Sequence, residues 1–424
     1  MTGLHLIIML FALIAIGVPI TFALGISSLA FFILNDIPLA TFAQKLAMSV
    51  DSFPLLALPF FILAGNLMNN GGITKRLFKF ANAFLGGIRG GLSYVCILSS
   101  MLFSALSGSA LANAAGLGTI QIKAMEEHGY DKEFAATLTA SAAILGPIIP
   151  PSVIMIIYGV TAGVSIRSMF LAGILPGVLL SFMYAVMCFY SGRKLNFPKG
   201  EKFSFRVAWD GFKDAVWALL APLIILGGIF SGMFTATEAG AVACLYSFIV
   251  GLLVYKDLKL RDMGSVILEA GKTTGTILFI AATAAVLGFC LTYAMVPQAL
   301  ASVLVDHINN KYALLFIFMV VYLFMGCIME ASAIVITTIP IFLPLCVALQ
   351  IELVYFGVFI GILMSIGTIT PPVGTAMFVI CKSAGIPIER FSVIMLPWFM
   401  IIGLFILLLI FFPQIVLVVP TMFR

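Results

Sequence analysis

A shortage of charge constrains this chain more than any other feature of its sequence. Asp, Glu, Lys and Arg make up only 9% of its 424 residues, whereas hydrophobic residues make up 62%. Soluble domains carry about 25% charged residues, because their surfaces face water. A chain with so little charge cannot cover a water-exposed surface, so we expect it to lie in a lipid bilayer.

The apolar runs are long and continuous, as in residues 168–188 and 391–412. In lipid, backbone N–H and C=O groups must pair within the protein, which permits only helices or closed barrels as spanning structures. Barrel strands alternate apolar and polar residues over about ten positions, and these runs do not alternate. We therefore predict an all-α polytopic membrane protein with about ten transmembrane helices and two re-entrant hairpins.

The two halves of the chain repeat the same landmarks in the same order. Their offsets lie between 215 and 223 residues: Gly17 and Gly25 match Gly232 and Gly240, Ser109-Ala110 matches Ser332-Ala333, Pro150-Pro151 matches Pro371-Pro372, and Pro176 matches Pro397. Chance would give one such match easily, but four in register are unexpected. We interpret the halves as a duplication that forms two inverted repeats, the usual plan of secondary transporters.

The basic residues support this inverted arrangement. If the N-terminus lies outside, the predicted cytoplasmic loops hold 18 of the 22 Lys and Arg residues, and the other four are Lys45, Arg167, Lys311 and Arg424. Lys and Arg concentrate in cytoplasmic loops of membrane proteins. The N-terminal segment has neither a basic region nor a small-residue cleavage site, so we expect a retained span rather than a signal peptide.

Each predicted repeat contains a hairpin followed by a broken helix, because Ser/Gly-rich or proline-rich interruptions leave pieces shorter than the roughly 20 residues that cross a bilayer. The first repeat is residues 1–192, with the hairpin at about 88–125 and the broken helix at 134–162. The second is residues 215–424, with the hairpin at about 312–350 and the broken helix at 353–384. We predict that residues 193–214 form a cytoplasmic linker between them.

The residues predicted to bind ions lie at the interruptions of the helices. Proline lacks an N–H, so each Pro-Pro pair leaves carbonyl groups without helical partners, and such groups are costly in lipid. A kink satisfied by a neighbouring helix explains one break equally well, but two matched breaks, each with a polar hairpin tip, favour Na⁺ sites. The predicted Na⁺-binding residues are Ser107, Ser109, Asn113, Gly146, Pro147, Pro150, Gly326, Glu330, Gly367, Thr370, Gly374 and Thr375.

An anionic substrate is predicted to bind beside these ions. Helix N-termini near Ser109 and Ser332 carry partial positive charge and free N–H groups, and Ser152 could add a donor. Glu330 is the carboxylate most deeply placed in a hydrophobic context, which makes it a functional candidate. It could balance Na⁺, carry a proton or orient a substrate hydroxyl. Close helix packing is the alternative explanation for the serines and glycines.

The sequence contains no complete motif for nucleotide binding, metal binding or catalysis. Gly271-Lys272-Thr273 resembles part of a phosphate-binding loop, but Val266 stands where the upstream glycine is required. The histidines are isolated and form no metal set, and we find no nucleophile–base pair. The loop distribution explains the net charge of +5. We predict a protein that is not an enzyme, binds no nucleic acid, and needs no cofactor apart from Na⁺ as coupling ion.

Four motifs together resemble a known family. They are residues 103–110 (FSALSGSA), 146–152 (GPIIPPS), 340–344 (PIFLP) and 370–374 (TPPVG). A chain with these motifs is similar to the large membrane subunit of tripartite ATP-independent periplasmic (TRAP) transporters, and it looks most like the sialic acid branch. The resemblance covers essentially the whole chain. The sequence departs from the family at two positions, because many relatives carry Asp where Glu330 and Asn113 stand.

The resemblance implies an elevator-type transporter of the ion transporter superfamily in the bacterial inner membrane. Na⁺ would bind where each hairpin tip meets its broken helix, and the anionic substrate would lie between the tips. The substrates of the family are usually carboxylates, including C4-dicarboxylates and sialic acid. The implied partners are a small four-helix membrane subunit and a soluble periplasmic substrate-binding protein.

Three alternatives stand beside sodium-coupled carboxylate uptake with a binding protein. The first is a stand-alone Na⁺/carboxylate symporter that needs no partner. The second is an intramembrane enzyme, which would require a paired nucleophile and base. The third is a structural membrane anchor, for which matched broken helices would have no purpose.

Overall fold

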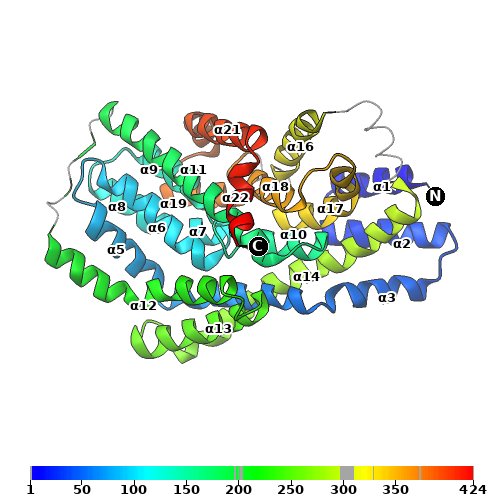
Figure 1. The fold of residues 1–424 in the computed structure, drawn as a ribbon, viewed down its shortest axis with the longest axis horizontal. Coiled ribbons are helices and arrows are strands. Elements are labelled where there is room, and N and C mark those ends of the chain that lie inside the picture. Colours follow the sequence, from blue (N-terminus) through cyan, green and yellow to red (C-terminus); the bar gives the residue numbers. More distant parts are fainter. Residues whose placement is uncertain are drawn as a thin grey trace.

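The computed structural model describes residues 2–194, 197–198, 200, 204–296, 310–327, 329–371 and 374–423. All regular secondary structure in these residues is helical, and no strand occurs among them. The prediction of an all-α protein is therefore confirmed. Figure 1 shows the helices in one continuous assembly, with α12, α13 and α3 along its lower edge. Pro372, the second proline of the later predicted break, lies outside the described residues.

The first half of the chain forms short helices followed by one long helix. They are α1 (Gly3–Ala15), α2 (Ile20–Leu34), α3 (Leu39–Val50), the 3₁₀ turn η1 (Phe53–Leu56), α4 (Ala57–Asn70), α5 (Ile73–Leu85), α6 (Gly91–Ser107), α7 (Ala110–Gly116), α8 (Gly118–Glu127), α9 (Lys132–Ala143), α10 (Val153–Ala162) and α11 (Ile166–Lys194). The interruptions lie between α6 and α7 and between α9 and α10.

The second half begins with longer helices and then repeats this pattern. Its elements are α12 (Phe205–Phe230), α13 (Ala236–Ile249), the π-helical turn η2 (Val250–Val254), the 3₁₀ turn η3 (Leu260–Asp262), α14 (Met263–Tyr293), α16 (Lys311–Gly326), α17 (Ala331–Ala348), α18 (Leu353–Gly367), α19 (Thr375–Ala384), α20 (Ile388–Ile394), α21 (Leu396–Phe411) and α22 (Gln414–Met422). Because α11 ends at Lys194 and α12 begins at Phe205, helix occupies both ends of the predicted linker, and the segment between the helices is shorter than predicted.

Several helices are long and apolar enough to cross a membrane. In the described ranges there are six such segments, or seven if the bent pair α20 and α21 counts as one span. The bend between α20 and α21 is 53°. Other apolar helices have 10–17 residues, and they include α6, α10, α16, α18 and α19. These pieces are too short to cross the hydrocarbon region alone, so a polytopic membrane protein with interrupted segments follows.

Side-chain caps fix where the helices begin around the interruptions. Asp131 caps α9, and its Oδ2 accepts a hydrogen bond from the Phe134 N–H at 2.9 Å. Ser109 caps α7, Ser152 caps α10 and Glu330 caps α17. Each such cap contributes about 1 kcal/mol to a helix start. For α7, α9, α10 and α17, the residue just before the helix therefore sets where the helix begins.

One offset relates the later part of each half. Asp131 and Glu352 occupy the positions just before α9 and α18, and they are 221 residues apart, as are the matched prolines. The caps Ser109 and Glu330 of α7 and α17 are also 221 residues apart. The predicted match of Ser109 with Ser332, at an offset of 223, is therefore wrong. Glu330 is the residue that corresponds to Ser109.

The two broken helices exchange partners between the halves. Helix α9 packs against α6, α7 and α8 of its own half and also against α19, whereas α10, beyond the break, packs mainly against α17 of the other half. In the same way, α18 packs against α16 and α17, whereas α19 packs against α7 and α8. Figure 1 shows α7 and α10 together at the middle of the molecule. Both breaks therefore lie where the halves interlock.

The remaining helices form a second group, in which α2 packs against α14, and α4 against α13 and α14. Helix α5, which leads into α6, is held to this group by Arg76. Its guanidinium pairs with Asp214 at 3.2 Å and with Asp257 at 2.5 Å. The guanidinium carbon also lies 3.7 Å from the centre of the Tyr255 ring. A planar cation with several donors suits this combination of ion pairs and ring contact.

Candidate cation and substrate site

The tip of the first hairpin lies directly against the first break. Gly108 has a φ of +61°, in the left-handed region that favours glycine. A Cβ atom at Gly108 would lie 2.5 Å from the Pro151 carbonyl oxygen, and one at Gly146 would lie 2.6 Å from the Ser109 carbonyl oxygen. The Val153 N–H donates to the Gly108 carbonyl at 3.4 Å. Only residues without side chains allow the two backbones to approach this closely.

Ser152 supports the break itself. Pro151 has no N–H to donate to the carbonyl of Pro147, four residues earlier. The Ser152 hydroxyl donates to that carbonyl instead, at 2.6 Å, and accepts the Met155 N–H at 3.3 Å. Ser152 is fully buried. Its hydroxyl proton is therefore used inside the break, which differs from the predicted role as a donor to substrate.

The first tip also holds buried polar side chains. Asn113 is 1% exposed, and its Nδ2 donates to the Ser104 hydroxyl at 3.0 Å and to the Ser100 carbonyl at 3.4 Å. The Ser107 hydroxyl oxygen is buried without a hydrogen-bond partner in the described part of the chain. A buried hydroxyl left unpaired costs about 1–3 kcal/mol. An oxygen of this kind at a break is suited to bind a cation.

The second break repeats the backbone approach with different partners. A Cβ atom at Gly367 would lie 2.6 Å from the Gly326 carbonyl oxygen. The Thr370 hydroxyl donates to the Ile366 carbonyl at 2.7 Å, which leaves its lone pairs available to a cation. A Cβ at Gly374 would lie 2.9 Å from the Thr370 carbonyl oxygen. The predicted residues Gly326, Gly367, Thr370 and Gly374 therefore lie together, and Thr375, at the start of α19, is exposed.

Glu330 caps the second hairpin helix. Its Oε2 accepts the Ala333 N–H at 3.2 Å, and its Oε1 accepts the Ser332 hydroxyl at 2.9 Å. Glu330 is exposed on the surface of the chain, whereas Ser332 is 3% exposed. The positive end of a helix dipole stabilises a carboxylate at this position. The protein therefore does not bury Glu330, although the surrounding sequence is hydrophobic.

Gln121 on α8 is a buried polar residue that was not predicted from the sequence. Its Nε2 lies 3.1 Å from the Cys96 carbonyl, 3.1 Å from the Ser99 hydroxyl and 3.0 Å from the Ser100 hydroxyl. Gln121 is 1% exposed. The available signal was an amide side chain in the second arm of a predicted hairpin, because a polar side chain is expensive in a membrane segment.

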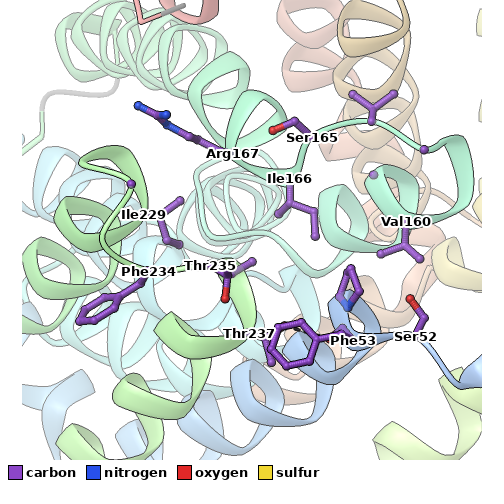
Figure 2. Close-up of a pocket in the computed structure, with 16 residues that line it drawn as sticks. Ser52, Phe53, Val160, Ser165, Ile166, Arg167, Ile229, Phe234, Thr235 and Thr237 are labelled. Carbon is purple, nitrogen blue, oxygen red and sulfur yellow. Dashed lines mark hydrogen bonds between the residues drawn. The ribbon is translucent and has the colours of Figure 1, made fainter.

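One cavity of the described chain lies away from these residues. It has a volume of about 530 Å³ and lies between η1, the α10–α11 turn and the α12–α13 turn. Figure 2 shows Thr235 and Val160 on opposite sides of it, with the guanidinium of Arg167 directed away from its centre. The Arg167 Nη2 donates to the Phe230 carbonyl at 2.6 Å. None of the predicted site residues lines this cavity.

An exposed ion pair joins the start of α9 to α20 and leads to a prediction on pH. Arg390 donates to Glu133 through Nε at 2.6 Å and through Nη2 at 2.8 Å. Hydrogen bonding from Arg390 lowers the pKa of Glu133 below its usual value. The folded-state pKa is then below the unfolded value of about 4.3. The pair therefore stabilises the fold above about pH 4.3, and this contribution is lost as the pH falls through the folded-state pKa.

We expect the apparent melting temperature to fall less steeply on acidification in Glu133→Gln than in the parent protein. The difference should be small, because the pair is on the surface. Thermal unfolding in detergent between pH 6 and the lowest tolerated pH measures it. Glu127→Gln, which removes the exposed 3.8 Å pair with Lys123, is the matched control. Superimposable pH profiles for the parent and Glu133→Gln would contradict the assignment.

Comparison with known proteins gives consistent matches over nearly the whole chain. The sequence model of the family described as "Tripartite ATP-independent periplasmic transporter, DctM component" matches residues 7–415. The chain is 40% identical over 410 residues to the sialic acid TRAP transporter permease protein SiaT of Haemophilus influenzae, covering 96% of this chain and 66% of SiaT. It is 39% identical over 408 residues to the large permease protein SiaM of Vibrio cholerae, covering 96% of each chain.

Two further comparisons extend this result. The C4-dicarboxylate TRAP transporter large permease protein DctM of Rhodobacter capsulatus is 35% identical over 437 residues, covering 100% of this chain and 99% of DctM. Among solved structures, the YdaH transporter of Alcanivorax borkumensis superposes with a TM-score of 0.64 at 14% identity, covering 88% of this chain and 87% of that one. At such low identity the structural match shows a shared fold alone.

Proposed function

Because this chain belongs to the DctM family of tripartite ATP-independent periplasmic transporters, we propose that it performs sodium-coupled uptake of an anionic carboxylate through the bacterial inner membrane. Similar proteins carry names for sialic acid and for C4-dicarboxylates. These acids share the carboxylate group and differ in the rest of the molecule. The carboxylate is therefore the substrate class that the site must recognise.

The observation that carries the proposal is the repeated approach of hairpin and break. Gly146 lies against the backbone of Ser109 in the first half, and Gly367 lies against Gly326 in the second half. Gly146 and Gly367 are 221 residues apart. The two glycines therefore occupy equivalent positions, although the residues that they contact, Ser109 and Gly326, are 217 residues apart. Each contact brings main-chain groups of a hairpin and a break together, as expected for a transporter site built from inverted repeats.

The residues present fit a sodium ion at each contact. The buried, unpaired Ser107 hydroxyl supplies an oxygen in the first site, and the Thr370 lone pairs supply one in the second. The proposed ligands are oxygens of Ser107, Ser109, Asn113, Gly146, Pro147 and Pro150 in the first site, and of Gly326, Glu330, Gly367, Thr370, Gly374 and Thr375 in the second. A bound Na⁺ would supply positive charge beside an anionic substrate.

The substrate is proposed to bind between the starts of α7 and α17. N–H groups at helix N-termini favour anions, and Ser109 and Glu330 precede these two helices. Ser332 donates to Glu330 and is nearly buried, so we assign it to the orientation of that carboxylate. Ser152 is assigned to the support of the first break and not to direct contact with substrate.

Movement is proposed to take place between the two groups of helices. The interlocked group contains the hairpins and broken helices, α6–α10 and α16–α19, and the second group contains α2, α4, α13 and α14. An elevator mechanism would move the first group against the second. The chain would act with a small four-helix membrane subunit and a soluble periplasmic substrate-binding protein, as the tripartite description of the family implies.

Uptake in proteoliposomes tests the proposal. The chain is reconstituted with its small membrane subunit, and labelled sialic acid or labelled succinate is supplied with the binding protein. We expect an inward Na⁺ gradient to drive accumulation of one of these acids, because the ion sites adjoin the substrate site. Equal uptake with a choline gradient would refute sodium coupling. Full uptake by the chain alone would favour the stand-alone symporter instead.

A further inference from the structure

A file of buried polar side chains runs through the first hairpin and α9. Its members are Cys96, Ser99, Ser100, Ser104, Asn113, Gln121 and Thr139, and none of them is more than 1% exposed. We call this set the hairpin polar file. It extends along α6 toward Ser107 at the tip in one direction and toward Ser93 in the other. The Ser93 end adjoins the basic loops that the charge distribution places in the cytoplasm.

Polar contacts connect the file from one member to the next. Asn113 donates to the Ser104 hydroxyl, which in turn donates to the Ser100 carbonyl at 2.5 Å. Gln121 contacts both the Ser99 and the Ser100 hydroxyls. The file therefore joins the two arms of the hairpin through side chains rather than through apolar packing.

Hydrogen bonds to the local backbone satisfy only some of the polar atoms in the file. Ser99 donates to the Val95 carbonyl at 2.6 Å, as serine often does within a helix. Two buried oxygens nevertheless have no hydrogen-bond partner in the described residues: the Gln121 Oε1 and the Ser107 hydroxyl. They lie at the middle of the file and at the tip, whereas the Ser93 hydroxyl at the other end lies beside the Tyr130 hydroxyl. Each unpaired buried polar atom carries a cost of about 1–3 kcal/mol.

The second hairpin provides an internal comparison, because its helices follow the same register. At an offset of 221 residues, every member of the file is replaced by an apolar residue: Ile317, Val320, Val321, Met325, Ile334, Phe342 and Ile360. The second hairpin contains instead one closed pair, in which the Tyr322 and Thr338 hydroxyls lie 2.7 Å apart. The fold can thus be built without polar residues at these positions.

From this asymmetry we infer that the hairpin polar file binds ordered water molecules and forms a hydrated path from the first tip to the predicted cytoplasmic end of α6. Buried water typically makes two to four hydrogen bonds to polar groups that are otherwise unsatisfied. The Gln121 Oε1 and the Ser107 hydroxyl are such groups. The second hairpin, with apolar residues in the same places, is dry.

A role of this hydrated path in Na⁺ transport rests on the proposed function. If Na⁺ binds at the first tip, the file offers oxygen atoms between that site and the cytoplasmic side. The ion could then be rehydrated as it leaves, on the side toward which net uptake proceeds. The second hairpin offers no equivalent route, so the two repeats would differ in how their ions are released.

Hydroxyl-radical labelling tests the hydration directly. X-ray irradiation generates radicals from water in place, so a buried cysteine beside bound water is oxidised faster than one in dry surroundings. Cys96 belongs to the file, with its Sγ 3.8 Å from the Thr139 hydroxyl, and Cys346 lies on α17 of the second hairpin. Both are 0% exposed. In the complex with the small subunit, we expect oxidation of Cys96 to be several-fold faster than that of Cys346. Equal rates would overturn the inference.

A matched pair of variants makes the test specific to the file. Gln121→Leu should slow Cys96 oxidation to the rate of Cys346, whereas Phe342→Leu, at the equivalent position of the second hairpin, should leave the Cys96 rate unchanged. If Gln121→Leu does not fold, Ser99→Ala should lower the same rate. Rapid oxidation of Cys96 that persists in a folded Gln121 variant would refute the role of the file. Labelling requires no transport, so its outcome is separate from that of the sodium-coupled uptake assay.

Discussion

Replacement of Gly146 by alanine is expected to reduce sodium-driven uptake by about fivefold to hundredfold, because the new methyl group has no space. Its Cβ would lie 2.6 Å from the carbonyl oxygen and 2.7 Å from the carbonyl carbon of Ser109. Both belong to backbone, so neither can rotate away as a flexible side chain would. Overpacking of this kind costs about 1–3 kcal/mol, and each 1.4 kcal/mol corresponds to about tenfold in an equilibrium. The initial rate of uptake in proteoliposomes measures the effect.

Gly403→Ala is the matched control for this substitution. Gly403 lies within α21, and a Cβ there would meet no heavy atom within 4 Å. We expect this variant to transport like the parent. Gel filtration must show that both variants are folded, so that the loss in Gly146→Ala reports on the site. Parental uptake by a folded Gly146→Ala would show that the tip and the break need not touch during transport.

Much of the local structure could be predicted, because the signals for it are local. Proline removes a helix donor wherever it occurs, and the residue types at Ser109 and Asp131 favour helix starts. These rules located the interruptions between α6 and α7 and between α9 and α10. The shortage of charge likewise indicated a membrane protein, and the long apolar runs without alternation indicated helices. Neither signal depends on how the helices pack.

The partner exchange of the broken helices could not be predicted in this way. Nothing in the sequence of α10 states that it packs against α17 rather than against its own hairpin. Such a choice depends on contacts between residues far apart in the chain. The hairpin register failed for a related reason: Ser109 and Ser332 share a residue type, but the helix start of α17 is set by the carboxylate of Glu330.

The hydrogen-bond partners of individual hydroxyl groups also could not be predicted from the sequence. Ser152 and Ser107 both lie at the first contact, and each was predicted to face a ligand. In the structure the Ser152 hydroxyl donates to the Pro147 carbonyl, whereas the Ser107 hydroxyl has no partner among the described residues. The difference arises from a single carbonyl that lost its helical donor to Pro151. Composition and spacing do not reveal which hydroxyl satisfies it.

Glu330 provides the second large expected effect, because its carboxylate can act as a helix cap, as a charge near Na⁺, or as both. Asp and Asn are equally good helix caps, and Ala is a poor one. If the charge contributes to the second ion site, Glu330→Asp should retain a near-parental half-saturating Na⁺ concentration for uptake, whereas Glu330→Asn should raise it about tenfold or more. Hydrogen bonds and contacts that involve a charged group contribute about 1.5–3 kcal/mol, which corresponds to this change.

The Glu330→Asn variant distinguishes a helix cap from a charge near Na⁺, because Asn keeps the cap and removes the charge. A residue that only caps α17 would give equal Na⁺ dependence for Glu330→Asp and Glu330→Asn, with a loss of thermal stability confined to Glu330→Ala. Asp131→Asn is the control, because it removes the charge from the cap of α9, where the side chain accepts the Phe134 N–H. Its half-saturating Na⁺ concentration should not change. A similar rise in Asp131→Asn would show that any lost cap charge weakens Na⁺ binding, and Glu330 would then have no special role in the second site.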